Sequence, residues 1–269
     1  MLNNITLGQY YPADSVVHKL DPRVKILLLV ALIVGIFLGQ NLLSYVPVAA
    51  FLFLAARLSK VPFSMLLKGL KPLRFILVFT FVLNIFFLQG ETPLLDLGFV
   101  VIKQESVITA SHYCSRLVLL VLASSLLTLT TAPITLTDGL ERLLSPLRVI
   151  HFPAHEMAMM MTIALRFIPT LIEETGKIMS AQKARGADFE SGSLFARAKA
   201  LVPVLVPLFI SAFRRADELA VAMECRLYRG GHGRTRLHQL KYTKLDLLGG
   251  IVVVLVCAGI IVLSRVSPV

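Results

Sequence analysis

The chain has 269 residues, of which 56% are apolar and only 16% are charged, and its mean hydropathy is +0.78. Soluble globular domains are usually about 45–50% apolar and about 25% charged. This composition therefore excludes the disordered and fibrous classes and argues against a soluble enzyme. The formal net charge of +11 would suit nucleic-acid binding, but in a membrane protein its usual cause is retention of Lys and Arg on the cytoplasmic side. The composition indicates an integral membrane protein.

Five apolar stretches are candidates for transmembrane helices. A helix needs about 20 mostly apolar residues to cross roughly 30 Å of hydrocarbon. The first two stretches are short and adjoin, so we expect a tight helical hairpin there; two half-spanning segments are the alternative. The first 23 residues are polar and mixed, so no cleaved secretory signal is expected. The predicted spans are 24–39, 42–56, 72–88, 111–131 and 245–263.

Basic and non-basic loops alternate along the chain. Three cations lie around the start of the first span, the turn at 40–41 carries no charge, and 57–74 carries five cations and no acid. The loop before the fourth span holds three acidic residues and one lysine, whereas 132–244 holds 16 Lys and Arg against 10 Asp and Glu. The positive-inside rule then places the N-terminus and 132–244 in the cytoplasm and the C-terminus outside. The basic charge is a topology signal, and nucleic acid is not expected as a partner.

These patterns predict an all-α integral membrane protein with about five transmembrane helices and a cytoplasmic set of amphipathic helices lying along the membrane. We expect three regions. Residues 1–131 form an N-terminal membrane region with four transmembrane helices, 132–244 form a cytoplasmic helical domain, and 245–269 form a C-terminal transmembrane helix.

Leucines recur at helical spacing after the fourth span and predict a short amphipathic helix that ends near Pro146. A second helix is predicted over about 154–185. Its apolar first half resembles a span, but Arg166 and Pro169 would be costly near the middle of a bilayer. We therefore expect this helix to lie along the cytoplasmic face.

A third helix is predicted over about 194–228, with apolar residues again at steps of three and four. Pro203 and Pro207 interrupt its first half, so we expect a bend there. The glycine-rich basic stretch that follows Tyr228 is predicted to be a loop.

The sequence contains no recognisable catalytic, cofactor or metal site. It has no Gly-x-x-x-x-Gly-Lys-Ser/Thr motif, so the chain is not expected to hydrolyse ATP itself. His155-Glu156 begins like a zinc-protease helix, but the residue four positions after His155 is Met159. The three cysteines are far apart and odd in number, which argues against a disulfide framework. Inside the predicted spans we single out only Arg116, near an outer end, so enzymatic activity and a bound cofactor are not expected.

Two helix ends remain as candidate functional features. Gly186 suits the left-handed position just past a helix C-terminus, and Arg185 before it complements the negative helix end while its planar guanidinium projects outward. Arg226 occupies an equivalent place at the end of the third helix. The alternative is an ordinary solvated helix end. Two long helices that each end in a projecting arginine favour a paired docking site for carboxylate-lined grooves on a partner.

Over nearly its whole length the chain resembles the transmembrane coupling component of energy-coupling factor transporters, the bacterial vitamin and metal importers of the ABC class. No single tripeptide is specific, but the ordered set of motifs is. The segments that carry the resemblance are Asp21-Pro22-Arg23, Ala164-Leu165-Arg166-Phe167-Ile168-Pro169-Thr170, Ala181-Gln182-Lys183-Ala184-Arg185-Gly186-Ala187-Asp188-Phe189, Leu201-Val202-Pro203-Val204-Leu205-Val206-Pro207-Leu208-Phe209 and Ala222-Met223-Glu224.

The resemblance implies where the ATPases dock. In that family two Ala-Arg-Gly motifs end two long coupling helices and fit into grooves of two ATP-binding cassette subunits. The first motif is intact here, so the resemblance assigns docking to Ala184, Arg185, Gly186 and Arg226. The second motif departs from the pattern, because Cys225 and Leu227 replace the flanking alanine and glycine. That departure puts its helix-ending role in question.

The resemblance also implies a mechanism. The two ATPases close on ATP and open on hydrolysis, and the long helices pass that movement to one or more small substrate-binding membrane proteins, which topple in the bilayer and choose the transported substrate. Pro169, Pro203 and Pro207 are candidate hinges. The apolar faces of the two helices would grip the substrate-binding protein; the alternative is that they pack on one another. The candidate contact residues are Met157, Met159, Met160, Met161, Phe209 and Phe213.

The expected protein is therefore a non-enzymatic, multi-pass subunit of a bacterial cell-membrane importer of vitamins or other micronutrients, with two ABC-type ATPases, substrate-binding membrane proteins and the bilayer as partners. A polytopic membrane enzyme is one alternative and would need catalytic residues within its spans. A stand-alone secondary carrier is another and would predict inverted repeats and broken helices. Neither feature is evident in the sequence.

Overall fold

The computed structural model describes residues 10–87, 93–96, 101–189, 191, 193–230 and 239–266. The fold is almost entirely helical, which confirms the predicted all-α membrane class. Its internal contacts divide the chain into two compact units. One unit, called here the membrane unit, contains the described residues of 8–143 and 239–266, and the other, the helical-pair unit, contains those of 144–230.

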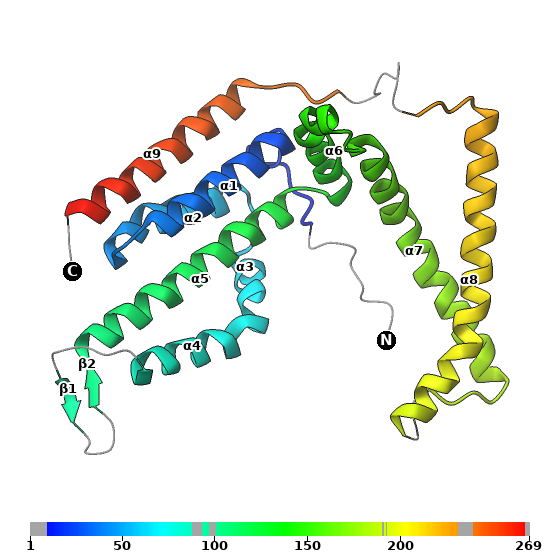
Figure 1. The fold of residues 1–269 in the computed structure, drawn as a ribbon, viewed down its shortest axis with the longest axis horizontal. Helices are drawn as coiled ribbons and strands as arrows, with labels where there is room; N and C mark the ends of the chain where they lie inside the picture. Colours follow the sequence, from blue (N-terminus) through cyan, green and yellow to red (C-terminus); the bar gives the residue numbers. More distant parts are fainter. Residues whose placement is uncertain are drawn as a thin grey trace. The chain divides into compact units, whose positions relative to one another are not determined.

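The membrane unit is built from apolar helices joined by short turns, and Figure 1 shows α1, α5 and α9 running side by side in it. Its elements are α1 (Pro22–Leu38), the 3-10 turn η2 (Leu42–Tyr45), α2 (Val46–Leu58), α3 (Phe63–Leu70), the 3-10 turn η3 (Lys71–Leu73), α4 (Arg74–Phe87), β1 (Pro93–Asp96), β2 (Val101–Lys103), α5 (Gln104–Thr130), α6 (Pro133–Leu144) and α9 (Lys244–Val266).

Three helical segments among the described residues are long and apolar enough to cross a membrane: Phe63–Phe87, Gln104–Thr130 and Lys244–Arg265. They correspond to the third, fourth and fifth predicted spans. The first two predicted spans are shorter: α1 has 17 residues, and an apolar helical segment runs from Leu42 to Leu58. At 1.5 Å per residue α1 is about 25 Å long, slightly less than a hydrocarbon core of about 30 Å.

The basic segment 57–74, predicted as a loop, contains a helix instead. It includes α3, which joins α4 through η3, and the two helices run in different directions (Figure 1). Pro72 lies within η3, and a proline removes a backbone donor and disfavours straight helix before it. A run of cations does not exclude a helix, because lysine is a good helix former.

A short antiparallel hairpin of β1 and β2 precedes α5 and was not predicted. The fourth predicted span also begins later than α5, which starts at Gln104 and has 27 residues. Polar residues in the first turns of α5 had suggested a loop. The predicted amphipathic helix that ends near Pro146 is present as α6, followed by the 3-10 turn η4 (Ser145–Ile150).

Polar side chains tie the start of α1 to the start of α9. Asp21 caps α1, because its Oδ1 accepts the backbone N–H of Arg23 at 2.9 Å, and its carboxylate pairs with the Arg23 guanidinium at 2.7 Å. The backbone N–H of Asp21 donates to Oδ1 of the buried Asp246 at 2.8 Å, while Oδ2 of Asp246 accepts from Thr243. The Asp21-Pro22-Arg23 motif therefore starts α1 and fixes α9 beside it.

The core of the membrane unit lies where α1, α2, α5 and α9 meet. Ile36 of α1 and Ile260 of α9 are fully buried there. Gly35 permits the close approach of these two helices, since a Cβ at this position would lie 2.9 Å from Sγ of Cys257. Small residues at helix contacts are typical of membrane proteins, in which tight backbone approach stabilises the packing.

The helical-pair unit contains η4 followed by two long helices, α7 (Ala154–Ala184) and α8 (Leu194–Cys225). These match the second and third predicted cytoplasmic helices to within a few residues. They run antiparallel and cross each other (Figure 1). The side-chain contacts between them pair the beginning of one helix with the end of the other, from Gln182 with Pro203 to His155 with Tyr228.

Candidate functional site

The C-terminus of α7 is built as the sequence predicts. The N–H of Ala187 donates to the carbonyl of Gln182 at 3.0 Å, and that of Gly186 donates to the carbonyl of Lys183 at 3.0 Å. This pair of bonds is the Schellman motif, in which a left-handed residue ends the helix. Gly186 is that residue, with φ of +88°. Arg185 is the last residue before it, and its side chain is exposed.

The C-terminus of α8 has the same hydrogen-bond pattern although its sequence differs. The N–H of Tyr228 donates to the carbonyl of Met223 at 3.0 Å, and that of Leu227 donates to the carbonyl of Glu224 at 2.8 Å. Leu227 occupies the left-handed position, with φ of +55°. The helix-ending geometry of the second motif is therefore retained without its glycine. Arg226 stands where Arg185 stands in α7 and is also exposed.

We call the C-termini of α7 and α8, with Arg185 and Arg226, the two arginine ends. They lie far apart, one at each extremity of the helix pair. Because α7 and α8 are antiparallel, their C-termini point in opposite directions (Figure 1). Arg185 and Arg226 are separated by most of the length of α8, whose 32 residues correspond to about 48 Å. Within this chain the arginines form two separate, equivalent points and not one joint site.

A polar contact between α7 and α8 holds the pair near the middle and was not predicted. The carboxylate of Glu174 accepts a hydrogen bond from the Ser211 hydroxyl and pairs with the Arg215 guanidinium at 3.1 Å. The Ser211 hydrogen bond, followed by the interaction with Arg215, lowers the pKa of Glu174 below its ordinary value. This contact, which we call the central clamp, could not be found from the sequence because its two sides are 37 and 41 residues apart.

Most of the residues expected to contact a substrate-binding protein lie on the surface of the helical pair. Phe209 and Phe213 of α8 are 61% and 68% exposed. Met157, Met160 and Met161 of α7 are also exposed, and Met159 is half-buried. The side chains that α7 buries are instead Ala154 and Ala158. Packing of α7 on α8 therefore does not account for the exposed methionines and phenylalanines.

The three candidate hinge prolines all lie inside helices. Pro169 is within α7, and Pro203 and Pro207 are within α8. α8 changes direction in its first half (Figure 1), which agrees with the predicted bend. A role of these prolines in movement stays a prediction.

Arg116 lies in a hydrogen-bonded cluster inside the membrane unit. Its guanidinium donates to the Tyr45 hydroxyl at 2.9 Å, to the Gly39 carbonyl at 3.0 Å and to Nε2 of His112 at 3.0 Å. Arginine only donates, so Nε2 of His112 accepts and its ring proton is assigned to Nδ1. The cluster explains how α5 tolerates a cation, since intramembrane charges are paired or bonded to backbone carbonyls.

His112 lies in the same predicted span as Arg116, but its part in this cluster was not predicted from the sequence. No group of three or more His, Cys, Asp or Glu side chains that could hold a metal ion occurs within the part of the chain that the structure describes. Tyr45, His112 and Arg116 hydrogen-bond to one another, whereas Nδ1 of His112 is buried without a hydrogen-bond partner in the described part of the chain.

Comparison with known proteins identifies the family. Residues 13–237 match the family model described as cobalt transport protein. The chain is 54% identical, over 268 residues, to the energy-coupling factor transporter transmembrane protein EcfT of Clostridium kluyveri, covering 99% of this chain and 98% of that protein. It is 54% identical over 252 residues to EcfT of Acidaminococcus fermentans, covering 94% of each. This chain belongs to the EcfT family.

Membership of the EcfT family carries a transport role and a membrane location. The relative from Bacillus subtilis, 48% identical over 91% of this chain and 93% of that protein, bears the same name. Together with the three apolar helical segments, this identifies the chain as a transmembrane transporter component. As the name states, such a protein is one component of an energy-coupling factor transporter.

Proposed function

We propose that this chain is the coupling subunit of an energy-coupling factor importer that takes up a vitamin or another micronutrient. Two ATPase subunits bind the two arginine ends, and their movement passes along α7 and α8 to a separate substrate-binding membrane protein. One observation carries the proposal. Two helices of different sequence end in the same hydrogen-bonded geometry, and each presents an exposed arginine at opposite ends of one antiparallel pair.

Two docking points fit two ATPases. Each arginine has a planar guanidinium that suits bidentate contact with a carboxylate in a groove. Their separation leaves room for one partner at each end. When the ATPases approach or part, the crossing helices are displaced together because the central clamp joins them near their middle.

The exposed side chains on α7 and α8 supply the surface for the substrate-binding protein. Methionine is flexible and polarisable, so Met157, Met160 and Met161 can adapt to partners of differing shape. Phe209 and Phe213 add large apolar area on α8. In this proposal 132–244 and the N-terminus are cytoplasmic, the C-terminus is outside, and substrate selection belongs to the partner.

The test is purification of the tagged chain from its native membranes in mild detergent. The unchanged chain is expected to retain two ATP-binding subunits. Each single variant, Arg185→Glu or Arg226→Glu, is expected to retain fewer. The double variant is expected to retain none, although it still inserts into the membrane. The matched control is Arg214→Glu, which changes another exposed arginine of α8. Normal retention of the ATPases by the double variant would refute the docking assignment.

A further inference from the structure

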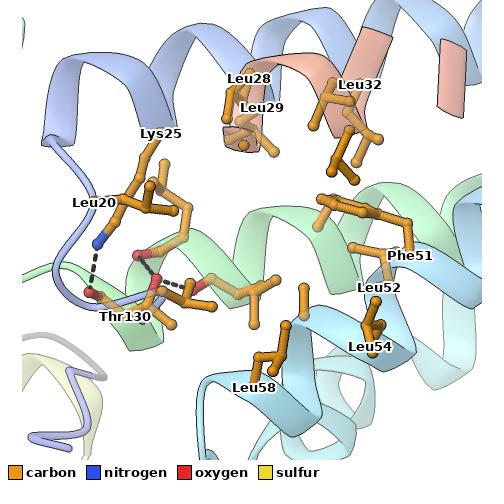
Figure 2. Close-up of a pocket in the computed structure, with 18 of the residues that line it drawn as sticks. Leu20, Lys25, Leu28, Leu29, Leu32, Phe51, Leu52, Leu54, Leu58 and Thr130 are labelled. Atoms are coloured by element: carbon orange, nitrogen blue, oxygen red, sulfur yellow. Dashed lines mark hydrogen bonds between the residues drawn. The ribbon is translucent and has the colours of Figure 1, made fainter. Parts of the chain in front are cut away.

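An apolar cavity of about 290 Å³ lies inside the membrane unit, among α1, α2, α5 and α9. This volume is near the lower end of the range for small-ligand pockets, about 300–1,000 Å³. Figure 2 shows leucines of α1 facing Phe51 and the leucines of α2 across it. Almost every lining side chain is aliphatic or aromatic; the polar ones are Lys25 and Thr130.

The cavity opens toward the surface of the membrane unit. Leu54 of α2 and Leu248 of α9 both line it, and they are 55% and 62% exposed. These helices lie in the apolar part of a transmembrane protein, so the medium at the opening is bilayer hydrocarbon. Water does not fill a cavity with this lining, because it needs several polar partners. A cavity with this lining suits an apolar molecule that enters from the bilayer.

The cavity has one polar end. Nζ of the buried Lys25 donates to the carbonyls of Thr130 at 3.0 Å and His18 at 3.3 Å, and to Oγ1 of Thr131 at 3.2 Å (Figure 2 shows the contact with Thr130). No carboxylate among the described residues lies within ion-pair distance of Nζ. The Lys25 ammonium group is therefore hydrogen-bonded to neutral acceptors, and the carboxylates of Asp246 and Asp21 act on it only from beyond ion-pair distance.

Two further cations border the same end. Lys19 precedes the lining residue Leu20, and Lys244 precedes the lining residue Leu245; both lysines are exposed. They lie at one end of the unit, because the start of α9 is hydrogen-bonded to the start of α1. A long apolar cavity with cations at one end complements a molecule that has an anionic head and a hydrocarbon tail.

We propose that this cavity binds one acyl chain of an anionic phospholipid, with the phosphate beside Lys19 and Lys244. The chain fills the space that α1, α2, α5 and α9 leave between them, and the lysines select the headgroup. The proposal does not depend on the docking of ATPases.

Fluorescence quenching can test it, because the chain contains no tryptophan. A single tryptophan is introduced by Phe51→Trp inside the cavity or by Phe75→Trp on the outer surface, where Phe75 is 78% exposed. The full chain is reconstituted in phosphatidylcholine vesicles with increasing fractions of phosphatidylglycerol brominated on its acyl chains. A lysine near a membrane surface favours anionic lipid about fivefold. The tryptophan at position 51, the cavity reporter, is therefore expected to be quenched at least fivefold more effectively by brominated phosphatidylglycerol than by brominated phosphatidylcholine. The tryptophan at position 75, the outer reporter, is expected to show a smaller difference.

Two neighbouring glycines of α9 supply a matched pair of variants. A Cβ at Gly249 would contact Leu28 at 3.5 Å, so Gly249→Leu places its side chain in the cavity, whereas a Cβ at Gly250 has nothing within 4 Å. Gly249→Leu is expected to remove the preferential quenching at the cavity reporter, and Gly250→Leu to leave it. The double variant Lys19→Gln, Lys244→Gln is expected to lower the preference for phosphatidylglycerol in the quenching of the cavity reporter. It leaves the cavity unfilled. Equal lipid preference at both reporters, or unchanged quenching in Gly249→Leu, would overturn the proposal.

Discussion

Leu227 is the residue at which the two arginine ends differ in backbone energy. Both ends need a left-handed residue after the arginine, and α7 has Gly186 there while α8 has Leu227. A left-handed conformation costs a residue with a side chain about 1–2 kcal/mol. The Leu227 side chain is 74% exposed, so little packing within the chain offsets that cost. The end of α8 therefore holds strain that the end of α7 does not.

Leu227→Gly is expected to stabilise the chain by about 1 kcal/mol, because glycine adopts this conformation without a Cβ clash. Thermal unfolding in detergent measures the change. The reciprocal variant Gly186→Leu is expected to destabilise by about 1–2 kcal/mol. A loss of stability in Leu227→Gly would show that the leucine makes a stabilising contact that outweighs its strain.

The sequence was informative where a residue type has one conformational use. Gly186 after a long amphipathic run predicts a helix end, and the structure has it. Leu227 carries no such signal, since leucine disfavours the left-handed region, and only the hydrogen bonds from Leu227 and Tyr228 reveal the matching end. Contacts such as that of Glu174 with Arg215 depend on the register of two helices and have no local signature.

At the scale of helices, the central clamp fixes how α7 and α8 cross. Glu174 accepts from Ser211 and Arg215, and these bonds favour its ionised form. The pKa of Glu174 is therefore lower in the folded chain than in the unfolded chain. Its contribution to stability is complete at neutral pH and is lost as the pH falls through that lowered pKa.

Glu174→Gln is expected to weaken the pairing of α7 with α8 by about 0.2–1 kcal/mol, the usual range for an exposed ion pair. Stability measured against pH should then lose the part of its acid dependence that Glu174 supplies. The control is Glu173→Gln, which changes the exposed neighbouring carboxylate. If Glu173→Gln and Glu174→Gln had the same effect, the clamp would have no special role.

Pro203 and Pro207 could serve α8 in two ways: as a hinge at which the helix moves, or as the cause of a fixed bend. Replacing both with alanine restores backbone donors inside the helix and is expected to straighten and stiffen α8. If bending passes the ATPase movement on, uptake into cells should fall while the complex still assembles. Uptake at the original rate would show that the prolines shape the helix without taking part in movement.

At the scale of the whole chain, the helical segments were predicted more reliably than their bounds. Continuous apolar runs of spanning length located α9 and most of α5, and apolar residues at helical spacing located α7 and α8. α3 and the β1–β2 hairpin were missed, since each is short and contains or adjoins charged residues. The cavity could not be predicted at all, because it depends on side chains from four helices that are distant in sequence.

The account as a whole depends on an ATP-binding subunit at each arginine end. Cys225 is an exposed free thiol next to Arg226, and Ala184 holds the equivalent position next to Arg185. A photo-activated cross-linker attached to Cys225 therefore probes one end. In the Ala184→Cys, Cys225→Ala variant the same reagent probes the other end.

The most direct measurement is cross-linking from these two positions in native membranes, followed by identification of the attached protein. An ATP-binding subunit is the expected product at both positions, and nucleotide-dependent yields would indicate that the ends move with the ATPases. Absence of an ATP-binding subunit at both positions, from membranes in which the complex transports, would contradict the account.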